Sequence, residues 1–377
     1  MYTWELKEWP NFTWDEEALK PRLEAVRLQQ GRLLGQSDAL YKELDMEAHM
    51  DALIQNAIQT SEIEGETLNA DSVRSSVIHH LGLTRAGLSH TDSSKGTLQT
   101  DALVGMLIDA TQNLDTDLTQ AKLCQWQAAL FPEGPGIIHP IKVGELRGND
   151  PMQVVSGRID KPTVHFEAPP GKQLVGELTA FVHWFNQPPK TLDGLLRAGI
   201  AHLWLVTLHP FVDGNGRVTR VVTDRALAQA EQESIRFYSL SASIMAYRKG
   251  YYEHLEQSQK GELDITSWLL WFLDTLEDAL KHGQNRFNRV IQKTRFWQTH
   301  SQTVLSARQI KVLNRLLDNL GDEFTQGISA SKYKSLAGVS KPTATRDLTE
   351  LVTKGCLLQL PGGGRSTRYQ INLEDIK

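Results

Sequence analysis

Cysteine is scarce in this chain. The 377 residues contain two cysteines, Cys124 and Cys356, far apart and in mostly apolar surroundings. Such a pair does not provide the disulfide framework of a small secreted domain, so we expect a reducing, cytoplasmic setting. Closely spaced cysteine and histidine ligands of the zinc-binding type are also missing, which argues against a structural zinc site.

Long apolar runs are missing as well. A run such as "WLLWFL" at Trp268–Leu273 is far shorter than the roughly 20 residues that a membrane-spanning helix needs. The first residues, "MYTWELKEWPNF", lack the basic segment and apolar stretch of a secretory signal. We therefore expect no membrane partner.

The charge is small overall but unevenly distributed. The formal net charge is −5, whereas residues 301–377 carry 11 Lys and Arg against 7 Asp and Glu, a net charge of +4. A basic C-terminal part on an acidic body predicts different partners for the two parts.

Apolar residues recur three and four positions apart over most of the chain, which predicts a mainly α fold. The length suggests two or three domains. We expect a helical N-terminal region over 1–97 and a helical domain over 98–290. Short β-rich runs within 138–170, "QVV" and "TVHFE", predict one β-hairpin in that domain.

Residues 300–377 are predicted to form a winged helix-turn-helix domain. Two helical segments are followed by a third with Ser340 as N-cap, Pro342 in its first turn and Gly355 just past its end, and then by two strands around a glycine-rich turn. Basic and hydroxyl residues on the third helix and wing suit DNA: Lys341, Thr343, Thr345, Arg346, Arg365 and Arg368. Docking to a protein is an equally open role.

The segment "LHPFVDGNGRVTR" predicts an anion site. The preceding apolar run should be a buried helix that ends at His209, because Pro210 restricts the residue before it. Asp213–Gly216 then leads into the start of another helix, where free backbone N–H groups and the helix dipole favour an anion. The glycines allow the backbone to approach it closely.

The side chains around this loop match a polyphosphate. Arg217 and Arg220 are three residues apart, so they project from roughly one helix face and can bind phosphate oxygens. Asp213 can hold Mg²⁺, and His209 can act as a general base. The alternative is an ordinary helical corner with a structural histidine and surface arginines, but so many suitable residue types within so short a segment favour a site.

"HPFVDGNGR", followed by Arg220, resembles at every position the signature of the Fic family. The resemblance implies a Fic-type helical core whose enzyme moves AMP from ATP to a protein hydroxyl and releases pyrophosphate. The implied general base is His209, the implied Mg²⁺ ligand is Asp213, and Phe211 would anchor the loop. The implied nucleotide-binding residues are Gly214, Asn215, Gly216, Arg217 and Arg220. The Doc-like branch has lysine in place of the second glycine and acts as a kinase, so Gly216 favours AMP transfer.

A second motif, "TSEIEGE" at Thr60–Glu66, ends an N-terminal helix. Taken alone it is a common helix ending, with Thr60 and Glu64 four residues apart on one face. Beside the Fic signature it resembles the family's inhibitory motif, which implies that Glu64 pairs with Arg220 and takes the place of the γ-phosphate. In some relatives the same glutamate supports AMP removal, so the direction of the reaction stays open.

The predicted hairpin resembles the family's flap, which holds a target segment beside the site. The implied target-binding residues are Val164, His165, Phe166 and Glu167. An ordinary surface hairpin is the alternative. Two further polar residues are predicted to be structural, namely Arg147 before the hairpin and His202 on the core helix.

Two classes of function remain. The first is a self-inhibited protein adenylyltransferase with ATP, Mg²⁺ and a hydroxyl-bearing protein target, or a de-AMPylase that uses the same site. The second is an ATP-sensing, DNA-binding regulator. The complete signature favours the enzyme, because a sensor would not need His209. Fic proteins often pair, so the resemblance also implies a possible homodimer.

Overall fold

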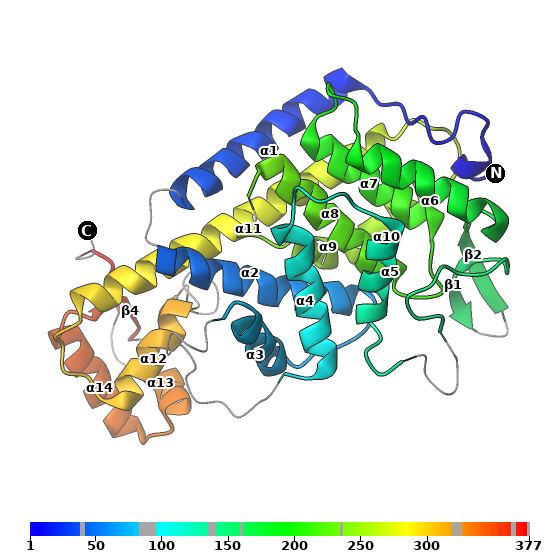
Figure 1. Cartoon of the computed structure of the whole chain (residues 1–377). Coiled ribbons are helices and arrows are strands. Elements are labelled where there is room, and N and C mark those ends of the chain that lie inside the picture. The colour runs from blue at the N-terminus through cyan, green and yellow to red at the C-terminus, as the bar shows by residue number, and fades with distance from the viewer. Residues whose placement is uncertain are drawn as a thin grey trace. The chain divides into compact units, whose positions relative to one another are not determined.

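The computed structural model describes residues 1–37, 42–82, 96–134, 141–158, 161–233, 237–318, 324, 326–362 and 367–374. Within these residues the chain is mainly helical, with two two-stranded sheets, as the sequence pattern predicts (Figure 1). It divides into two compact units, one of Met1–Ala39 and His49–Gly283 and one of Leu40–Ala48 and Gln284–Lys377. The division into three domains that the sequence suggests, 1–97, 98–290 and 300–377, stays a prediction.

The first elements in chain order are η1 (Thr3–Glu5), α1 (Glu16–Ser37), α2 (Lys42–Ile63), α3 (Ala70–His80), α4 (Leu98–Gln112) and α5 (Gln120–Ala129). Next come β1 (Gln153–Arg158), β2 (Lys161–Glu167), α6 (Gly171–Asn186), α7 (Gly194–Leu208), α8 (Asn215–Glu231), α9 (Leu240–Ala246), α10 (Arg248–Ser258) and α11 (Thr266–Thr299). The last are α12 (Ala307–Asp318), α13 (Ala330–Ala337), α14 (Lys341–Thr353), β3 (Leu357–Gln359) and β4 (Tyr369–Ile371).

Helices α7 and α8 form the centre of the larger unit, with α6 against α7 and with α4 and α5 against α8 (Figure 1). Helix α7 is apolar on nearly all sides and is buried from Leu195 to Leu208, apart from Arg197. At Gly199 a Cβ atom would lie 2.9 Å from the side chain of Leu269, so glycine permits close packing here. The indole of Trp268 donates a hydrogen bond of 2.8 Å to the Gly199 carbonyl. This packing fixes the helix that leads into the predicted anion-binding loop.

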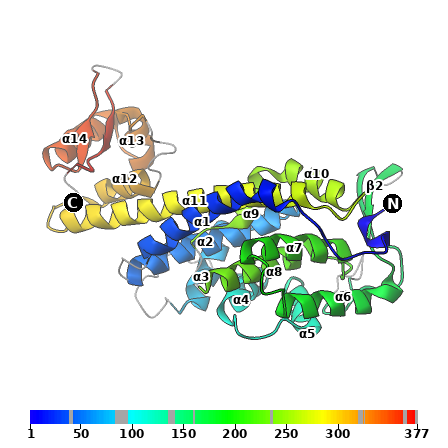
Figure 2. The same cartoon turned by 90° about the horizontal axis from the view of Figure 1, so that it is seen from above.

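The tryptophan-rich N-terminal segment lies against the same unit, beside the β1–β2 hairpin (Figure 2). The indole of Trp4 donates to the Glu167 carbonyl at 2.8 Å, and the ring of Tyr2 meets that of Phe166 edge to face. Aromatic rings bury large areas, so these contacts hold the end of β2 against the body.

The smaller unit contains helices α12, α13 and α14 followed by the antiparallel pair β3–β4. This is the predicted order of elements, and apolar residues from all of them share one core. The assignment as a winged helix that binds DNA stays a prediction. The glycine-rich turn between the two strands, including Arg365, lies outside the described residues.

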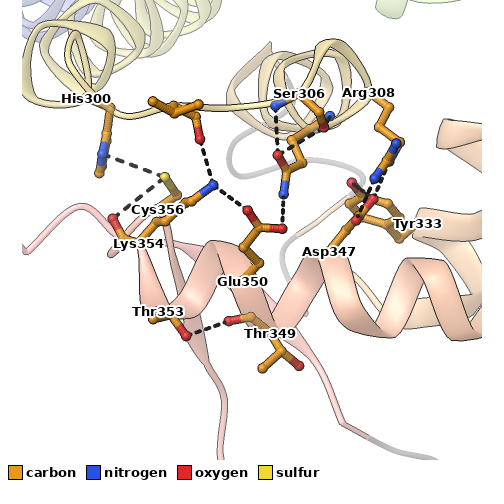
Figure 3. A network of polar contacts seen from close by, with 12 residues as sticks. His300, Ser306, Arg308, Tyr333, Asp347, Thr349, Glu350, Thr353, Lys354 and Cys356 are labelled. Atoms are coloured by element: carbon orange, nitrogen blue, oxygen red, sulfur yellow. Dashed lines mark hydrogen bonds and ion pairs between the residues drawn. The ribbon is translucent and has the colours of Figure 1, made fainter.

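A buried carboxylate organises the smaller unit (Figure 3). Asp347 on α14 is fully buried and accepts two hydrogen bonds from Arg308, at 2.6 and 3.0 Å, and one from the Tyr333 hydroxyl at 3.1 Å. The hydrogen bonds from Arg308 hold the pKa of this carboxyl below its usual value. The ionised form of Asp347 therefore ties three helices together.

We predict that Asp347→Asn lowers the free energy of unfolding of the smaller unit by about 2 kcal/mol at pH 7, because a charge-assisted contact is lost. A lowered native pKa stabilises the fold above the unfolded pKa, and this contribution disappears as the pH falls. Urea unfolding should thus show a smaller acid-induced loss of stability in the variant. Asp318→Asn removes the half-exposed partner of Lys293 and serves as the control, with little expected effect. Equal losses in both variants would contradict this account.

Candidate active site

The predicted loop begins where α7 ends. His209 follows Leu208 with φ +48°, a left-handed conformation, and its backbone N–H still reaches the Leu205 carbonyl. Its Nδ1 lies 3.0 Å from the Val206 carbonyl oxygen. A carbonyl oxygen can only accept, so this contact is a hydrogen bond when Nδ1 carries the ring proton. Nε2 is then the ring's proton acceptor. Burial keeps the pKa of His209 below its usual value, so the neutral ring is favoured near pH 7.

Arg147 holds this turn from outside. Its guanidinium donates to the carbonyls of His209, at 2.7 Å, and Pro169, at 2.5 Å, while its own backbone N–H donates to the Pro210 carbonyl. The predicted structural role of Arg147 fits these contacts.

The loop is also closed from within. The side chain of Asn215 accepts from the Phe211 N–H and donates to the Phe211 carbonyl, both at 2.9 Å. Phe211 is fully buried, as its predicted anchoring role requires. The amide of Asn215 thus closes the loop, and the residue also lines the pocket beside it.

The two glycines meet different requirements. Gly214 has φ +85°, and a Cβ atom there would lie 2.8 Å from the Leu130 side chain. Gly216 lies in the first turn of α8, where a Cβ atom would lie 2.1 Å from Oε1 of Glu64. The second glycine therefore makes room for a side chain that comes from α2 and the turn after it.

Arg220 is buried and paired with that segment. It donates to the Thr60 hydroxyl at 2.7 Å, to the Thr60 carbonyl at 2.8 Å and to the Glu64 carboxylate at 2.8 Å. Burial alone would raise the pKa of the Glu64 carboxyl, but the charge and hydrogen bond of Arg220 hold that pKa below its usual value. Glu64 therefore sits ionised at the loop.

Arg217 has a partner that the sequence analysis missed. Its buried guanidinium donates to Glu66 at 2.7 Å and lies 3.9 Å from the Asp213 carboxylate. No local pattern signals this pair, because its two residues lie 151 positions apart. Both cations of the predicted phosphate site are thus held by carboxylates of one short segment.

A pocket of about 720 Å³ opens beside the loop. The pocket is lined by residues of three groups, the loop with Glu64, the hairpin, and α10. A volume of this size is typical of sites for small ligands. The sequence analysis did not assign Arg248, Tyr251 or Tyr252 of α10 to the site, because nothing in their spacing connects them with a loop more than thirty residues earlier.

The four predicted flap residues lie in unlike environments. Val164 is exposed, and His165 and Phe166 both line the pocket. Phe166 is 2% exposed and packs against Tyr2. The carbonyl of Glu167 is taken by Trp4. The Phe166 ring therefore supports the hairpin, and the edge residues before it are better placed to meet a target.

His202 is a satisfied core histidine, in accord with its predicted role. Its two ring nitrogens lie 2.9 Å from the hydroxyls of Thr223 and Tyr251. Burial lowers the pKa of His202 to about 3. It supports α7 and α8 without taking part in chemistry.

The donor set fits a nucleotide triphosphate with Mg²⁺. Within the described residues, Nη1 of Arg220 and Nε of Arg217 are buried donors without a hydrogen-bond acceptor. The side chain of Asp213 is half exposed, and the residue lines the pocket. One carboxylate combined with substrate phosphates is a usual Mg²⁺ site in nucleotide enzymes.

Among the described residues, no helix is long and apolar enough to cross a membrane.

The loop, its histidine and its two arginines lie within a helical domain that is similar to known proteins. Residues 117–227 match the model of the Fic/DOC family, and residues 2–83 match a domain of unknown function (DUF4172). The Fic/DOC match runs from just before α5 to near the end of α8 and so includes the loop.

Curated relatives support the same family. The "Protein adenylyltransferase Fic" of Drosophila mojavensis is 32% identical over 147 residues, which cover 38% of this chain and 26% of the relative. The protein of that name from Drosophila melanogaster is 27% identical over 235 residues, 62% of this chain and 42% of the relative. The chain thus spans well under half of the length of these relatives.

Two solved structures share the fold. A Fic family protein from Desulfovibrio desulfuricans G20 aligns with a TM-score of 0.51 and 17% identity, over 93% of this chain and 96% of that one. A Fic domain containing signaling protein from Bacteroides thetaiotaomicron VPI-5482 has a TM-score of 0.51 and 15% identity, over 72% of this chain and 96% of that one.

We predict that Gly216→Ala destabilises the larger unit, because the new methyl group displaces the Glu64 carboxylate and leaves buried Arg220 without its charged partner. The expected cost is about 1–3 kcal/mol. In a Glu64→Gly background the same change should be neutral or slightly stabilising, since alanine favours a helix more than glycine. Thermal unfolding of the four proteins of this cycle measures the coupling. Additive effects would show that the two residues do not meet.

Proposed function

We propose that this chain is a protein adenylyltransferase that moves AMP from ATP to a hydroxyl side chain of a protein. The observation that supports it most is the loop itself, where His209, Asp213 and the glycine turn that begins α8 line one pocket. The same helix start carries two buried guanidinium groups, each with one donor that has no hydrogen-bond acceptor among the described residues. The names of the curated relatives point to the same activity.

In the proposed reaction, Nε2 of His209 takes the proton of the acceptor hydroxyl. The hydroxyl oxygen forms a bond to the α-phosphorus, the bond to the bridging oxygen breaks, and pyrophosphate leaves. Arg217 and Arg220 would hold the β- and γ-phosphates, and the N–H groups at the start of α8 would hold the α-phosphate. Asp213 would hold Mg²⁺, which neutralises phosphate charge.

We propose further that the enzyme inhibits itself. Arg220 cannot bind a γ-phosphate while Glu64 and Thr60 occupy it at 2.7–2.8 Å. The Glu66–Arg217 pair adds a second contact of the same kind. ATP would then bind in a pose unsuited to transfer until this segment moves.

Removal of AMP from a modified protein is a second candidate. Glu64 is ionised and lies beside the glycine loop, where a carboxylate can serve as the base for water. We also propose three partners for this chain. They are a hydroxyl-bearing protein target, DNA for the basic smaller unit, and a second copy of the chain in a homodimer.

We predict that Glu64→Gly raises AMP transfer by 10-fold or more. A charge-assisted hydrogen bond of about 1.5–3 kcal/mol that competes with ATP corresponds to roughly 10- to 100-fold. Incubation with ATP and Mg²⁺, followed by mass spectrometry for added AMP on the chain or on lysate proteins, measures it. Adding His209→Ala should reduce transfer by about 100-fold or more. If Glu64→Gly stays as inactive as the parent, the proposed inhibition is wrong.

We predict that Glu66→Gln weakens the inhibition to a smaller degree. The carboxylate of Glu66 is more than a third exposed, so its pair with Arg217 contributes less than about 1 kcal/mol, a few-fold in apparent ATP affinity. Isothermal titration with ATP and Mg²⁺ on the parent and variant measures this. Glu62→Gln in the same turn is the matched control, because no ion pair to its carboxylate is among the contacts described. A Glu66→Gln protein that binds ATP like the control would show that Glu66 takes no part in the proposed inhibition.

A further inference from the structure

Three side chains from three elements form a continuous hydrogen-bond relay on the wall of the pocket. The hydroxyl of Ser156 on β1 lies 2.5 Å from Nε2 of His165 on β2. Nδ1 of the same imidazole lies 2.9 Å from Oε2 of Glu256 on α10. All three residues line the pocket that contains His209. None of them is used by the adenylyl transfer described above.

A β-bulge directs His165 into this relay. Val154 pairs with Phe166 and Val155 pairs with Val164, so His165 is the extra residue of β2 and has no partner in the register. Bulges often re-aim a side chain next to an active site. Here the bulge places the ring between the neighbouring strand and helix α10.

The arrangement of donors and acceptors sets the direction of the relay. With the Nδ1 proton directed at the Glu256 carboxylate, Nε2 becomes the acceptor for the Ser156 hydroxyl. Lys260 binds the other oxygen of Glu256 at 2.5 Å, and these contacts keep the pKa of that carboxyl below its usual value. A hydroxyl backed by an imidazole and a carboxylate is an activated nucleophile.

The pocket determines which electrophile this nucleophile can meet. If the proposed function holds, the group bound beside the loop is the triphosphate of ATP. We propose that Ser156, activated by His165 and Glu256, is a self-modification site of this chain that accepts AMP from ATP. This inference rests on the proposed adenylyl transfer and names an acceptor within the chain itself.

The proposed step balances as follows. The Ser156 oxygen forms a bond to the α-phosphorus of ATP, the bond between that phosphorus and the bridging oxygen breaks, and pyrophosphate leaves with the electron pair. The hydroxyl proton moves to Nε2 of His165, and Glu256 stabilises the imidazolium that results. The product is a phosphodiester on a strand that lines the pocket.

The test uses the full chain carrying Glu64→Gly, with ATP and Mg²⁺, and peptide mapping by mass spectrometry. We expect one AMP on the peptide that contains Ser156. His165→Asn should lower that modification by about 100-fold, and Glu256→Gln, which keeps the shape but removes the charge, by about 10-fold. Ser156→Thr keeps a hydroxyl and should still carry AMP at position 156, whereas Ser156→Ala has no hydroxyl and should not.

Thr163 provides the matched control. It pairs with Ser156 across the hairpin and is exposed, but no hydrogen bond links its hydroxyl to His165 among the described contacts. Thr163→Ala should leave the modification of Ser156 intact. If these three residues only hold the hairpin in place, Ser156 will carry no AMP in any variant, and the proposal is wrong.

The failures of the two proposals are distinguishable. AMP on other residues or on lysate proteins, with none on Ser156, would overturn this inference and leave the adenylyl transfer standing. Modification of Ser156 that is unaffected by both His165→Asn and Glu256→Gln would overturn the relay. No AMP on any protein would contradict the proposed function itself.

Discussion

The ion pair between Arg220 and Glu64 is the contact on which the candidate site depends. It joins the segment that ends α2 to the first turns of α8, and it buries a guanidinium whose charge would otherwise be costly. A carboxylate in this place resembles a phosphate in charge and in its acceptor oxygens. Under the proposed function, this carboxylate and a nucleotide phosphate would compete for Arg220, and the free-energy difference between the two states would set the activity.

Much of the site was predictable because its parts are close in sequence. The helix ending at His209, the turn imposed by Pro210 and the two arginines on one face of α8 all follow from local rules. The pairing of Glu64 with Arg220 came from the resemblance of its motif and is present in the structure, whereas the inhibitory role stays a prediction. The mainly helical fold followed from periodicity alone.

The remaining features depend on contacts between distant segments. Glu66 meets Arg217 across about 150 residues, and the hairpin meets α10 across about 90. The bulge at His165 changes which face its side chain occupies, and no period-two pattern reveals that. Asn215 shows a different limit, because the sequence did not reveal that its side chain closes the loop, whereas its predicted part in nucleotide binding stays a prediction.

The closed loop has a consequence for how the pocket meets its ligand. The backbone is held in its bent shape by Pro210, by the two hydrogen bonds between Asn215 and Phe211, and by the hydrogen bonds that Arg147 donates to the carbonyls of this turn. Little ordering entropy is then left for a nucleotide to overcome on arrival. Under the proposed inhibition, binding would then depend on the displacement of Glu64 and Glu66, so a small movement of the segment that ends α2 would act as a switch.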